Sequence, residues 1–426
     1  MPKLRSLVLA AVLLLALPAA ASARAGELDT GFAGDGTALL GRAAADLNGA
    51  AVALQGDGRA TVAGGEGGRG FLVARLRASG RPDRSFGRRG SRTLRFDGAE
   101  RAGARDVALF RDGRILVAGN VTIGGVRRFA VARLQPRGNL DPNFGTDGVA
   151  IVGPPGAQLE AMALQPEGEL VLAGSAPGAP GAQGRRAVLV MRLLADGTPD
   201  PGFGSAGAVD SSAVKLAGQA RDVLVLPDGR IALAAAVERG RAARATFLAA
   251  RLTAAGAFDP TFDGDGVARV ATTTRRVRGG GAAAVALDRR GRLLLAGTAR
   301  GAGGRDDATV VRLMPNGRAD PRFGRAGVAR LTDPRGRSLR IAAMRRDARG
   351  RLVLGGRAAG LGAAVLRLRD DGRRDRSFGA AGLFGGALPR TRPAALALRG
   401  DGAVVIAGSA RLAGRGRLVV ARLRGR

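Results

Sequence analysis

The chain has 426 residues, with 68 Lys plus Arg against 35 Asp plus Glu and a formal net charge of +33. It contains no His, Cys, Trp or Tyr. These absences exclude disulfides, imidazole or thiolate metal sites, general acid–base catalysis by histidine, and nucleophiles activated by histidine.

Residues 1–25 have the pattern of an export signal. Two basic residues precede an apolar run from Leu7 to Leu17, which is followed by a proline and small residues. The run is short for a membrane span, so we expect cleavage after Ala23 or Ala25 and a secreted or cell-envelope location. An uncleaved N-terminal anchor is the alternative. We expect no transmembrane segment after signal removal.

The remaining chain repeats one motif seven times, in which Asp is followed by Phe at the third position and by Gly at the seventh. Successive Asp residues of this motif are 54, 58, 59, 59, 61 and 55 residues apart. A period of this size predicts a repeat architecture. The Asp–Phe pairs are Asp29 and Phe32, Asp83 and Phe86, Asp141 and Phe144, Asp200 and Phe203, Asp259 and Phe262, Asp320 and Phe323, and Asp375 and Phe378.

Four strands are predicted in each repeat, and the second repeated unit shows them clearly. The segment Val107-Ala108-Leu109 alternates large and small residues, Asp112-Gly113 is a tight-turn signal, and Ile115–Ala118 is continuously apolar. The strand that ends on Arg-Leu, Phe129–Leu134, is predicted as the fourth of this unit. The first strand of each unit is predicted as the short segment after the closing Gly, such as Thr37–Leu40 or Val149–Val152 in other units.

These elements predict an all-β, seven-bladed β-propeller with about four antiparallel strands per blade. An open β-solenoid is the alternative, because repeats alone do not establish ring closure. We expect residues 26–426 to form one domain. Its approximate repeats are residues 27–80, 81–138, 139–197, 198–256, 257–317, 318–372 and 373–426.

An Arg precedes six of the repeated Asp residues by eight positions. Asp29 has no such Arg before it and Arg422 has no such Asp after it, so these two would meet in a closed ring. We hypothesise that the pairs are charge-assisted hydrogen bonds that pin the turns between blades. The alternative is a solvated Arg at a strand end beside an Asp that caps a turn. The six Arg residues that precede a repeated Asp by eight positions are Arg75, Arg133, Arg192, Arg251, Arg312 and Arg367.

The segments LDPNFGTDG at Leu140–Gly148, ARL at Ala132–Leu134 and DGR at Asp112–Arg114 resemble the delta-60 repeat of bacterial secreted proteins. The resemblance extends over essentially all of the chain after residue 25. It implies a β-propeller, and it implies no catalytic residues because that repeat family has no established common function.

Three residues depart from the repeat pattern. Ala33 and Asp263 stand where the other repeats have Gly after Phe, and Arg346 stands where the others have Leu or Val. We expect weaker packing at these blades without a change of fold.

One acidic cluster, formed by Asp259, Asp263 and Asp265, is a calcium candidate because oxygen-rich loops with Gly can hold that ion. The spacing lacks the distal Glu of an EF-hand, and four of the seven repeats lack the second acid. Turn formation is therefore the better interpretation, and we expect no cofactor.

The sequence names no ligand, and the function that we favour is an exported non-catalytic binding or structural scaffold. We expect ligand contacts on the loops that differ most between repeats, such as Pro177–Arg186, Glu238–Arg244 and Ala299–Asp307. One alternative is a carboxylate-dependent hydrolase or lyase in the central channel.

A second alternative is electrostatic binding of acidic cell-envelope polymers. The strong bias toward Arg can also arise from genome composition, which we favour over selected polyanion binding. Aromatic stacking platforms for nucleic acid are not evident, so the sequence gives no specific nucleic-acid signal.

Overall fold

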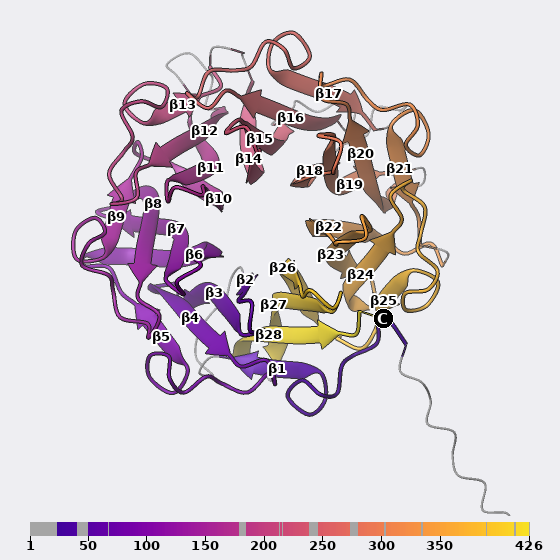
Figure 1. The fold of residues 1–426 in the computed structure, drawn as a ribbon, viewed down its shortest axis with the longest axis horizontal. Coiled ribbons are helices and arrows are strands. Elements are labelled where there is room, and N and C mark those ends of the chain that lie inside the picture. Colours follow the sequence, from indigo (N-terminus) through magenta and orange to yellow (C-terminus); the bar gives the residue numbers. More distant parts are fainter. Residues whose placement is uncertain are drawn as a thin grey trace, which may run out of the picture.

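The computed structural model describes residues 24–40, 50–66, 68–178, 185–212, 214, 216–237, 246–272, 280–301, 304–333, 335–388, 390–412 and 415–425. These residues form seven four-stranded antiparallel sheets arranged in a ring (Figure 1). The predicted seven-bladed β-propeller is therefore confirmed. Within the described ranges no helix is long and apolar enough to span a membrane.

Each blade is a meander whose first strand lines the centre of the ring (Figure 1). Blades 1 to 3 consist of β2 (Ala50–Leu54), β3 (Ala60–Glu66), β4 (Gly70–Leu76) and β5 (Ser91–Leu94); β6 (Ala99–Leu109), β7 (Ile115–Ile123), β8 (Val126–Leu134) and β9 (Val149–Val152); and β10 (Gln158–Leu164), β11 (Leu170–Pro177), β12 (Arg186–Leu193) and β13 (Ala208–Asp210).

Blades 4 to 6 follow the same order around the ring. They consist of β14 (Gly218–Val225), β15 (Ile231–Val237), β16 (Thr246–Leu252) and β17 (Val267–Ala271); β18 (Gly280–Leu287), β19 (Leu293–Arg300), β20 (Asp306–Leu313) and β21 (Val328–Leu331); and β22 (Leu339–Arg346), β23 (Leu352–Ala358), β24 (Gly362–Leu368) and β25 (Leu383–Gly385).

Blade 7 combines the two ends of the chain. Its first three strands are β26 (Thr391–Leu398), β27 (Val404–Leu412) and β28 (Arg415–Leu423), and its outermost strand is the N-terminal β1 (Thr37–Leu40). β1 pairs with β28 in antiparallel register, with Thr37 opposite Ala421 and Leu40 opposite Leu418. The ring is therefore closed by a sheet that combines strands from both ends of the chain, and an open solenoid is excluded.

The blades are offset from the sequence repeats by one strand. The short segment after each closing Gly, such as Val149–Val152, is the outermost strand of the blade begun in the preceding repeat. Each repeat thus contributes to two adjacent blades, which couples them covalently.

The core lies between neighbouring blades, where the middle strands are buried on both faces. β4, β16 and β24 are buried at every position, as expected for continuously apolar strands. The contact between blades 7 and 1 is packed in the same way, with Val405 and Val420 in one buried cluster with Val62 and Leu72.

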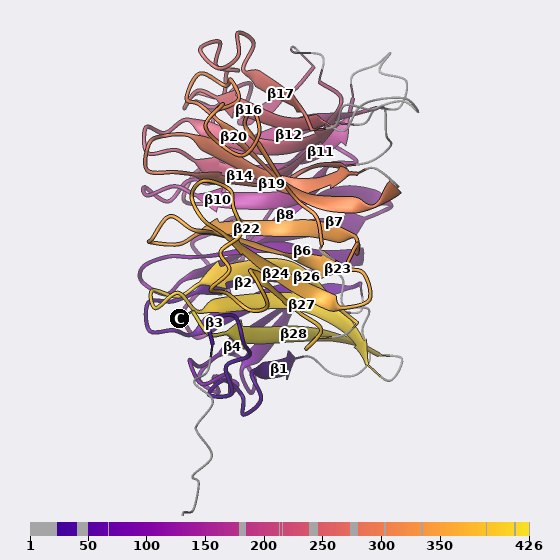
Figure 2. The ribbon, with the colours of Figure 1, turned by 90° about the vertical axis from the view of Figure 1, so that its right-hand side faces the viewer.

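The strands run through the thickness of the disc, so the connections gather on its two faces (Figure 2). We call one side the loop face; it carries the connections between the second and third strands of each blade, such as that between β7 and β8. We call the other the motif face; it carries the Asp-Gly turns and the Asp–Phe motifs. Gly113 in one such turn has φ 87°, which explains the Gly.

The Gly after Phe allows a close approach of two backbone segments on the motif face. Gly145 has φ 55°, and a Cβ there would lie 2.2 Å from the carbonyl oxygen of Val149. The amide of Thr146 donates to that same carbonyl at 2.8 Å. Any larger residue at Gly145 must therefore move the turn.

The two departures at this position follow a different path. Ala33 and Asp263 keep left-handed φ values of 56° and 55°. The next residues, Gly34 and Gly264, then take φ values of 95° and 87°. A second glycine thus compensates for the missing first one, and the fold of these blades is unchanged, as expected.

Candidate functional site

The seven Arg and Asp residues selected from the sequence meet as pairs on the motif face. Each Arg donates from Nε to Oδ2 of its Asp at 2.6 to 2.9 Å. The Arg side chains are only 2 to 15% exposed. They are therefore not solvated strand-end residues.

Each of these Arg side chains also joins two neighbouring blades, as Arg133 illustrates. Besides Asp141, it donates from its terminal nitrogens to the carbonyl oxygen of Asn143 at 2.7 Å and to that of Ala195 in the next blade. Its Cζ lies 4.9 Å from the centre of the Phe144 ring, in a cation–π arrangement. The same Arg–Asp–Phe contact recurs in all seven repeats, with 4.5 to 5.0 Å to the ring centre.

Hydrogen bonds to the Asp residues favour their charged form. Burial raises the pKa of Asp259, but hydrogen bonds from Thr261 and Arg230 and the charge of Arg251 outweigh it and lower the pKa to about 2. The same balance of burial against hydrogen bonds and Arg charge lowers the pKa of Asp83, Asp320 and Asp375. These side chains satisfy one another, and none of them lines either cavity described below.

Two of the three calcium candidates use their carboxylates in turns and ion pairs, and the third, Asp263, has φ 55° and donates its amide to the carbonyl of Asn316 at 2.9 Å. Asp259 binds Arg251, and Asp265 accepts from the amide of Val267 at 2.9 Å and from Arg269 at 2.8 Å. Over the described ranges, no three acidic side chains are grouped in a way that could hold a metal ion.

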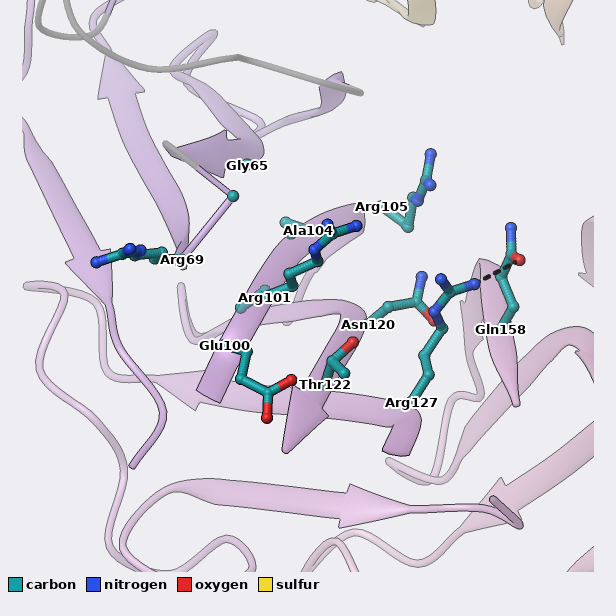
Figure 3. A pocket seen from close by; sticks show the side chains of 13 residues that line it. Gly65, Arg69, Glu100, Arg101, Ala104, Arg105, Asn120, Thr122, Arg127 and Gln158 are labelled. Atoms are coloured by element: carbon teal, nitrogen blue, oxygen red, sulfur yellow. Dashed lines mark hydrogen bonds between the residues drawn. The ribbon is translucent and has the colours of Figure 1, made fainter. Parts of the chain in front are cut away.

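A cavity of about 450 Å³ lies at the loop face of blades 1 to 3. Its wall includes four exposed arginines and one glutamate, so the lining carries a net charge of 4 − 1 = +3. Arg101 and Arg105 lie four residues apart on β6, and Arg127 lies at the start of β8. In Figure 3 Arg101 and Arg127 flank Asn120, Arg105 extends beyond them, and Arg69 lies apart.

Several polar groups of this cavity are held in place by hydrogen bonds within the protein. Arg127 donates to Oε1 of Gln158 at 3.1 Å, and the carboxylate of Glu100 accepts from the amide of Gly125 at 3.0 Å. By contrast, within the described ranges the guanidinium groups of Arg101 and Arg105 make no ion pair or hydrogen bond. The cavity therefore presents uncompensated positive charge to solvent.

Sequence reasoning expected binding on the connections before the Arg-Leu strands, and this cavity is lined by two connections of that kind. They are the β3–β4 connection with Arg69 and the β7–β8 hairpin beside Arg127. Most of Pro177–Arg186, all of Glu238–Arg244 and the middle of Ala299–Asp307 lie outside the described residues. The signal that was missed is the spacing of Arg101 and Arg105 on one inner strand.

Two carboxylates lie on innermost strands around the central channel. Asp106 on β6 accepts from the amides of Val107 and Met162, each at 2.8 Å, and Asp222 on β14 is bound in the same way by Val223 and Val285. Met162 and Val285 belong to the next blades. Both acids therefore tie neighbouring blades together.

Burial raises the pKa of both carboxylates. For Asp106 burial and the negative charge of Asp222 outweigh its hydrogen bonds and the charge of Arg345, and raise the pKa to about 6. Burial also raises the pKa of Asp222 against the charge of Arg345. Arg345 lies on β22, so all three residues belong to innermost strands around the channel.

Comparison with known proteins supports the architecture. Residues 111–144, 165–203 and 291–323 match the family described as a domain of unknown function (DUF5122) beta-propeller. No curated protein has a significantly similar sequence.

Several solved structures are similar to this chain at low sequence identity. The polysaccharide lyase Uly1 is 12% identical with a TM-score of 0.50, over 90% of this chain and 91% of that one. A protein of unknown function from Dyadobacter fermentans is 14% identical with a TM-score of 0.45, over 76% and 95%. The arabinofuranosidase Arb93A from Fusarium graminearum is 9% identical with a TM-score of 0.46, over 89% and 93%. At 12% identity the likeness to the lyase concerns the fold alone. The family matches support a β-propeller repeat family for this chain.

Proposed function

We propose that the protein is an exported, non-catalytic scaffold that binds an acidic polysaccharide through the arginine-lined cavity on its loop face. The observation that carries this proposal is the pair of exposed guanidinium groups of Arg101 and Arg105, which make no contact with an acid in the described residues. Exposed arginines that converge on one cavity attract anions and bind carboxylate or sulfate groups in a bidentate manner.

Many arginines elsewhere in the described chain are paired with acids, but others, such as Arg84 and Arg137, are exposed without an acidic partner among the described residues. The cavity differs from these isolated positions because four arginines line the same hollow. The seven Arg–Asp–Phe motifs neutralise their own arginines, and the Asp-Gly turns do so as well, with Arg114 bound to Asp112 and Arg230 bound to Asp228. A general compositional bias toward Arg explains the number of these residues. It does not by itself explain why four of them line one cavity.

The carboxylates of the channel are better explained as structural groups than as catalytic ones. Both oxygens of Asp106 and both oxygens of Asp222 already accept backbone amides. A raised pKa also suits a general acid, so a carboxylate-dependent hydrolase or lyase is the alternative function.

The binding proposal is tested with polygalacturonate as the probe, titrated calorimetrically at low and high ionic strength. The double variant Arg101→Gln/Arg127→Gln should lose about tenfold or more in affinity, because each charge-assisted hydrogen bond is worth about 1.5–3 kcal/mol. The control Arg84→Gln/Arg137→Gln removes the same charge from exposed positions on the motif face and should bind nearly as the parent does. Equal losses in the two variants would overturn a site on the loop face.

The same samples test the absence of catalysis. The chain length of the probe should be unchanged after prolonged incubation with the protein. Cleavage that is abolished by Asp106→Ala or Asp222→Ala, with binding retained, would instead establish the hydrolase or lyase alternative.

Export is proposed from residues 1–25, and the described N-terminal residues favour one of the two cleavage positions. The carbonyl of Ala25 accepts from the amide of Gly379 at 2.7 Å, and Ala25 is only 7% exposed. Cleavage after Ala23 keeps this contact, whereas cleavage after Ala25 removes it. The mass of the mature protein should therefore correspond to a chain beginning at Arg24, and a chain beginning at Gly26 would contradict this assignment.

A further inference from the structure

The innermost strands of six blades share a β-bulge at the same level of the channel. In each of β6, β10, β14, β18, β22 and β26 the register shifts by one residue near the middle of the strand. A bulge re-aims the side chain of its extra residue, and bulges are frequent beside ligand sites. The bulged residues are Arg105, Glu160, Arg221, Ala283, Ala342 and Ala394.

All six bulged residues line a second cavity of about 460 Å³ in the channel. Blades 2 to 4 contribute the charged residues Arg105, Glu160 and Arg221 to its wall. Blades 5 to 7 contribute only alanine at the bulge, and Gly280 and Gly281 lie beside them. One half of this channel cavity is therefore charged, and the other half is uncharged and mostly made of alanine and glycine, with Thr298 and Ile341.

The loop-face cavity and the channel cavity adjoin at Arg105, which lines both of them. Gln158 of the first cavity accepts from Arg127 and donates to Oε1 of Glu160 in the second at 2.7 Å. Gln219 donates to that oxygen at 2.6 Å. This series of hydrogen bonds forms a fixed wall that runs from one cavity into the other.

The same wall compensates its single acid. Glu160 accepts from two amide side chains and lies 3.9 Å from a terminal nitrogen of Arg221. Its charge is therefore largely satisfied within the protein. Arg105 lies at the junction without an acidic partner among the described residues, which makes the junction attractive to an anion.

We propose that the two cavities form one elongated site in which a linear acidic oligosaccharide enters at Arg101 and Arg127, passes Arg105, and ends beside Arg221 in the channel. This inference rests on the proposed function and adds the direction and length of the ligand. The Cα atoms of Arg101 and Arg105 alone are separated by about 13 Å along the strand. A chain with repeated acidic groups can contact each of these arginines in turn without drawing the two side chains together.

The lining also favours a polysaccharide over a single-stranded nucleic acid. Among the described residues, neither cavity wall includes an aromatic side chain, and nucleic-acid grooves without sequence preference depend on aromatic stacking. Amide side chains such as Asn120 and Gln158 beside the arginines are suited to the hydroxyl groups of sugars.

The test compares binding of galacturonic acid and its trimer and hexamer to the full-length mature protein. The parent should bind the hexamer about tenfold or more tightly than the trimer, because only the hexamer reaches the channel. Arg221→Gln should weaken hexamer binding about fivefold or more and leave trimer binding nearly unchanged. Arg101→Gln/Arg127→Gln should weaken both.

A second pair of variants guards against disturbance of the Glu160 network. Ala342 is exposed in the opposite wall of the channel cavity, so Ala342→Glu places a negative charge there and Ala342→Gln is its neutral control. Ala342→Glu should weaken hexamer binding and leave trimer binding unchanged, and Ala342→Gln should have a much smaller effect.

The outcomes separate the two proposals. Equal affinities for trimer and hexamer, or Arg221→Gln and Ala342→Glu without effect on the hexamer, would overturn the elongated site and leave the loop-face site in place. If Arg101→Gln/Arg127→Gln weakens binding no more than the control Arg84→Gln/Arg137→Gln does, the proposed function itself is overturned. Tighter binding of a single-stranded oligonucleotide of matched charge through the same residues would overturn the assignment to polysaccharide.

Discussion

Arg422 donates from Nε to Oδ2 of Asp29 at 2.7 Å, although 393 residues separate them. The pair stands beside the pairing of β1 with β28, and Arg422 also reaches the carbonyl oxygen of Ala78 in blade 1. The first and last described segments of the chain are therefore joined by the contact that joins every other pair of blades. Ring closure therefore uses the same Arg–Asp and Arg–carbonyl hydrogen bonds as the other blade contacts of the propeller.

A double-mutant cycle on this pair measures its contribution to closure. Asp29→Ala and Arg422→Ala should each lower the free energy of unfolding, with a coupling of about 1 kcal/mol or more, because residues in direct contact are not additive. The corresponding cycle on Arg133 and Asp141 should give a larger coupling, since that pair is less exposed. Additive effects of Asp29→Ala and Arg422→Ala in urea unfolding would contradict a stabilising role for the pair.

The internal pairs are predicted to stabilise the fold more strongly than exposed ones. Arg251→Met removes hydrogen bonds to Asp259, Thr261 and the carbonyl of Pro315 while keeping much of the side-chain volume. Breaking a buried pair leaves an uncompensated charge, so we expect a loss of about 3 kcal/mol and a clearly lower Tm.

The matched control for that variant is Arg269→Met. Arg269 is bound to Asp265 at 2.8 Å, but both side chains are more than a third exposed. Pairs of this kind contribute about 0–1 kcal/mol. Equal thermal stability of Arg251→Met and the parent protein would show that the buried motif does not stabilise the wheel.

Much of this architecture was predictable because each repeat contains the same short set of sequence signals. Phe144 and its equivalents are buried in every repeat, and Asp-Gly turns separate apolar strands, so strand number and order followed from the sequence. Asp29 and Arg422, which each lack a partner eight positions away in the sequence, indicated where the ring closes. The offset of blade against repeat did not follow, because hydrogen-bond partners of Val149–Val152 on β8 lie earlier in the chain and leave no local signal.

The candidate site was less predictable for a physical reason. Arg101 and Arg105 have no motif around them, and their common cavity exists because β6 of blade 2 lies beside the β3–β4 connection of blade 1. A contact between blades cannot be read from one repeat. The same holds for Asp106, whose hydrogen bond to Met162 crosses 56 residues.

The turn after Phe can be converted from one path to the other by two substitutions. Gly145→Ala alone should destabilise the protein by about 1–3 kcal/mol, because its Cβ meets the carbonyl of Val149 and its φ is positive. Adding Thr146→Gly recreates the Ala-Gly-Asp-Gly sequence of residues 33–36 and should recover most of the loss. Thermal unfolding measures both variants. A double variant less stable than Gly145→Ala would contradict the compensation that Gly34 provides in the first repeat.

The pH dependence of stability should show two opposite contributions from aspartates. The pKa of Asp259 is lowered to about 2 from 3.8, so its ionised form stabilises the folded state above about pH 4 and this stabilisation is lost as the pH falls toward 2. The pKa of Asp106 is raised to about 6, so it acts in the other direction. Between about pH 4 and pH 6 the folded state holds a proton on Asp106 that the unfolded state does not.

The variant Asp106→Ala isolates the second contribution. Alanine already occupies the equivalent position of β10, where Ala161 is the first residue after the bulge. The free energy of unfolding of the parent minus that of the variant should increase as the pH is lowered from about 7 to about 4, because proton binding to Asp106 stabilises only the parent. Below about pH 4 the difference should become constant, since the unfolded carboxyl is then protonated as well. Urea unfolding at a series of pH values measures this difference. A difference that is constant from pH 7 to pH 4, or that decreases on acidification, would show that burial in the channel wall does not raise the pKa of Asp106.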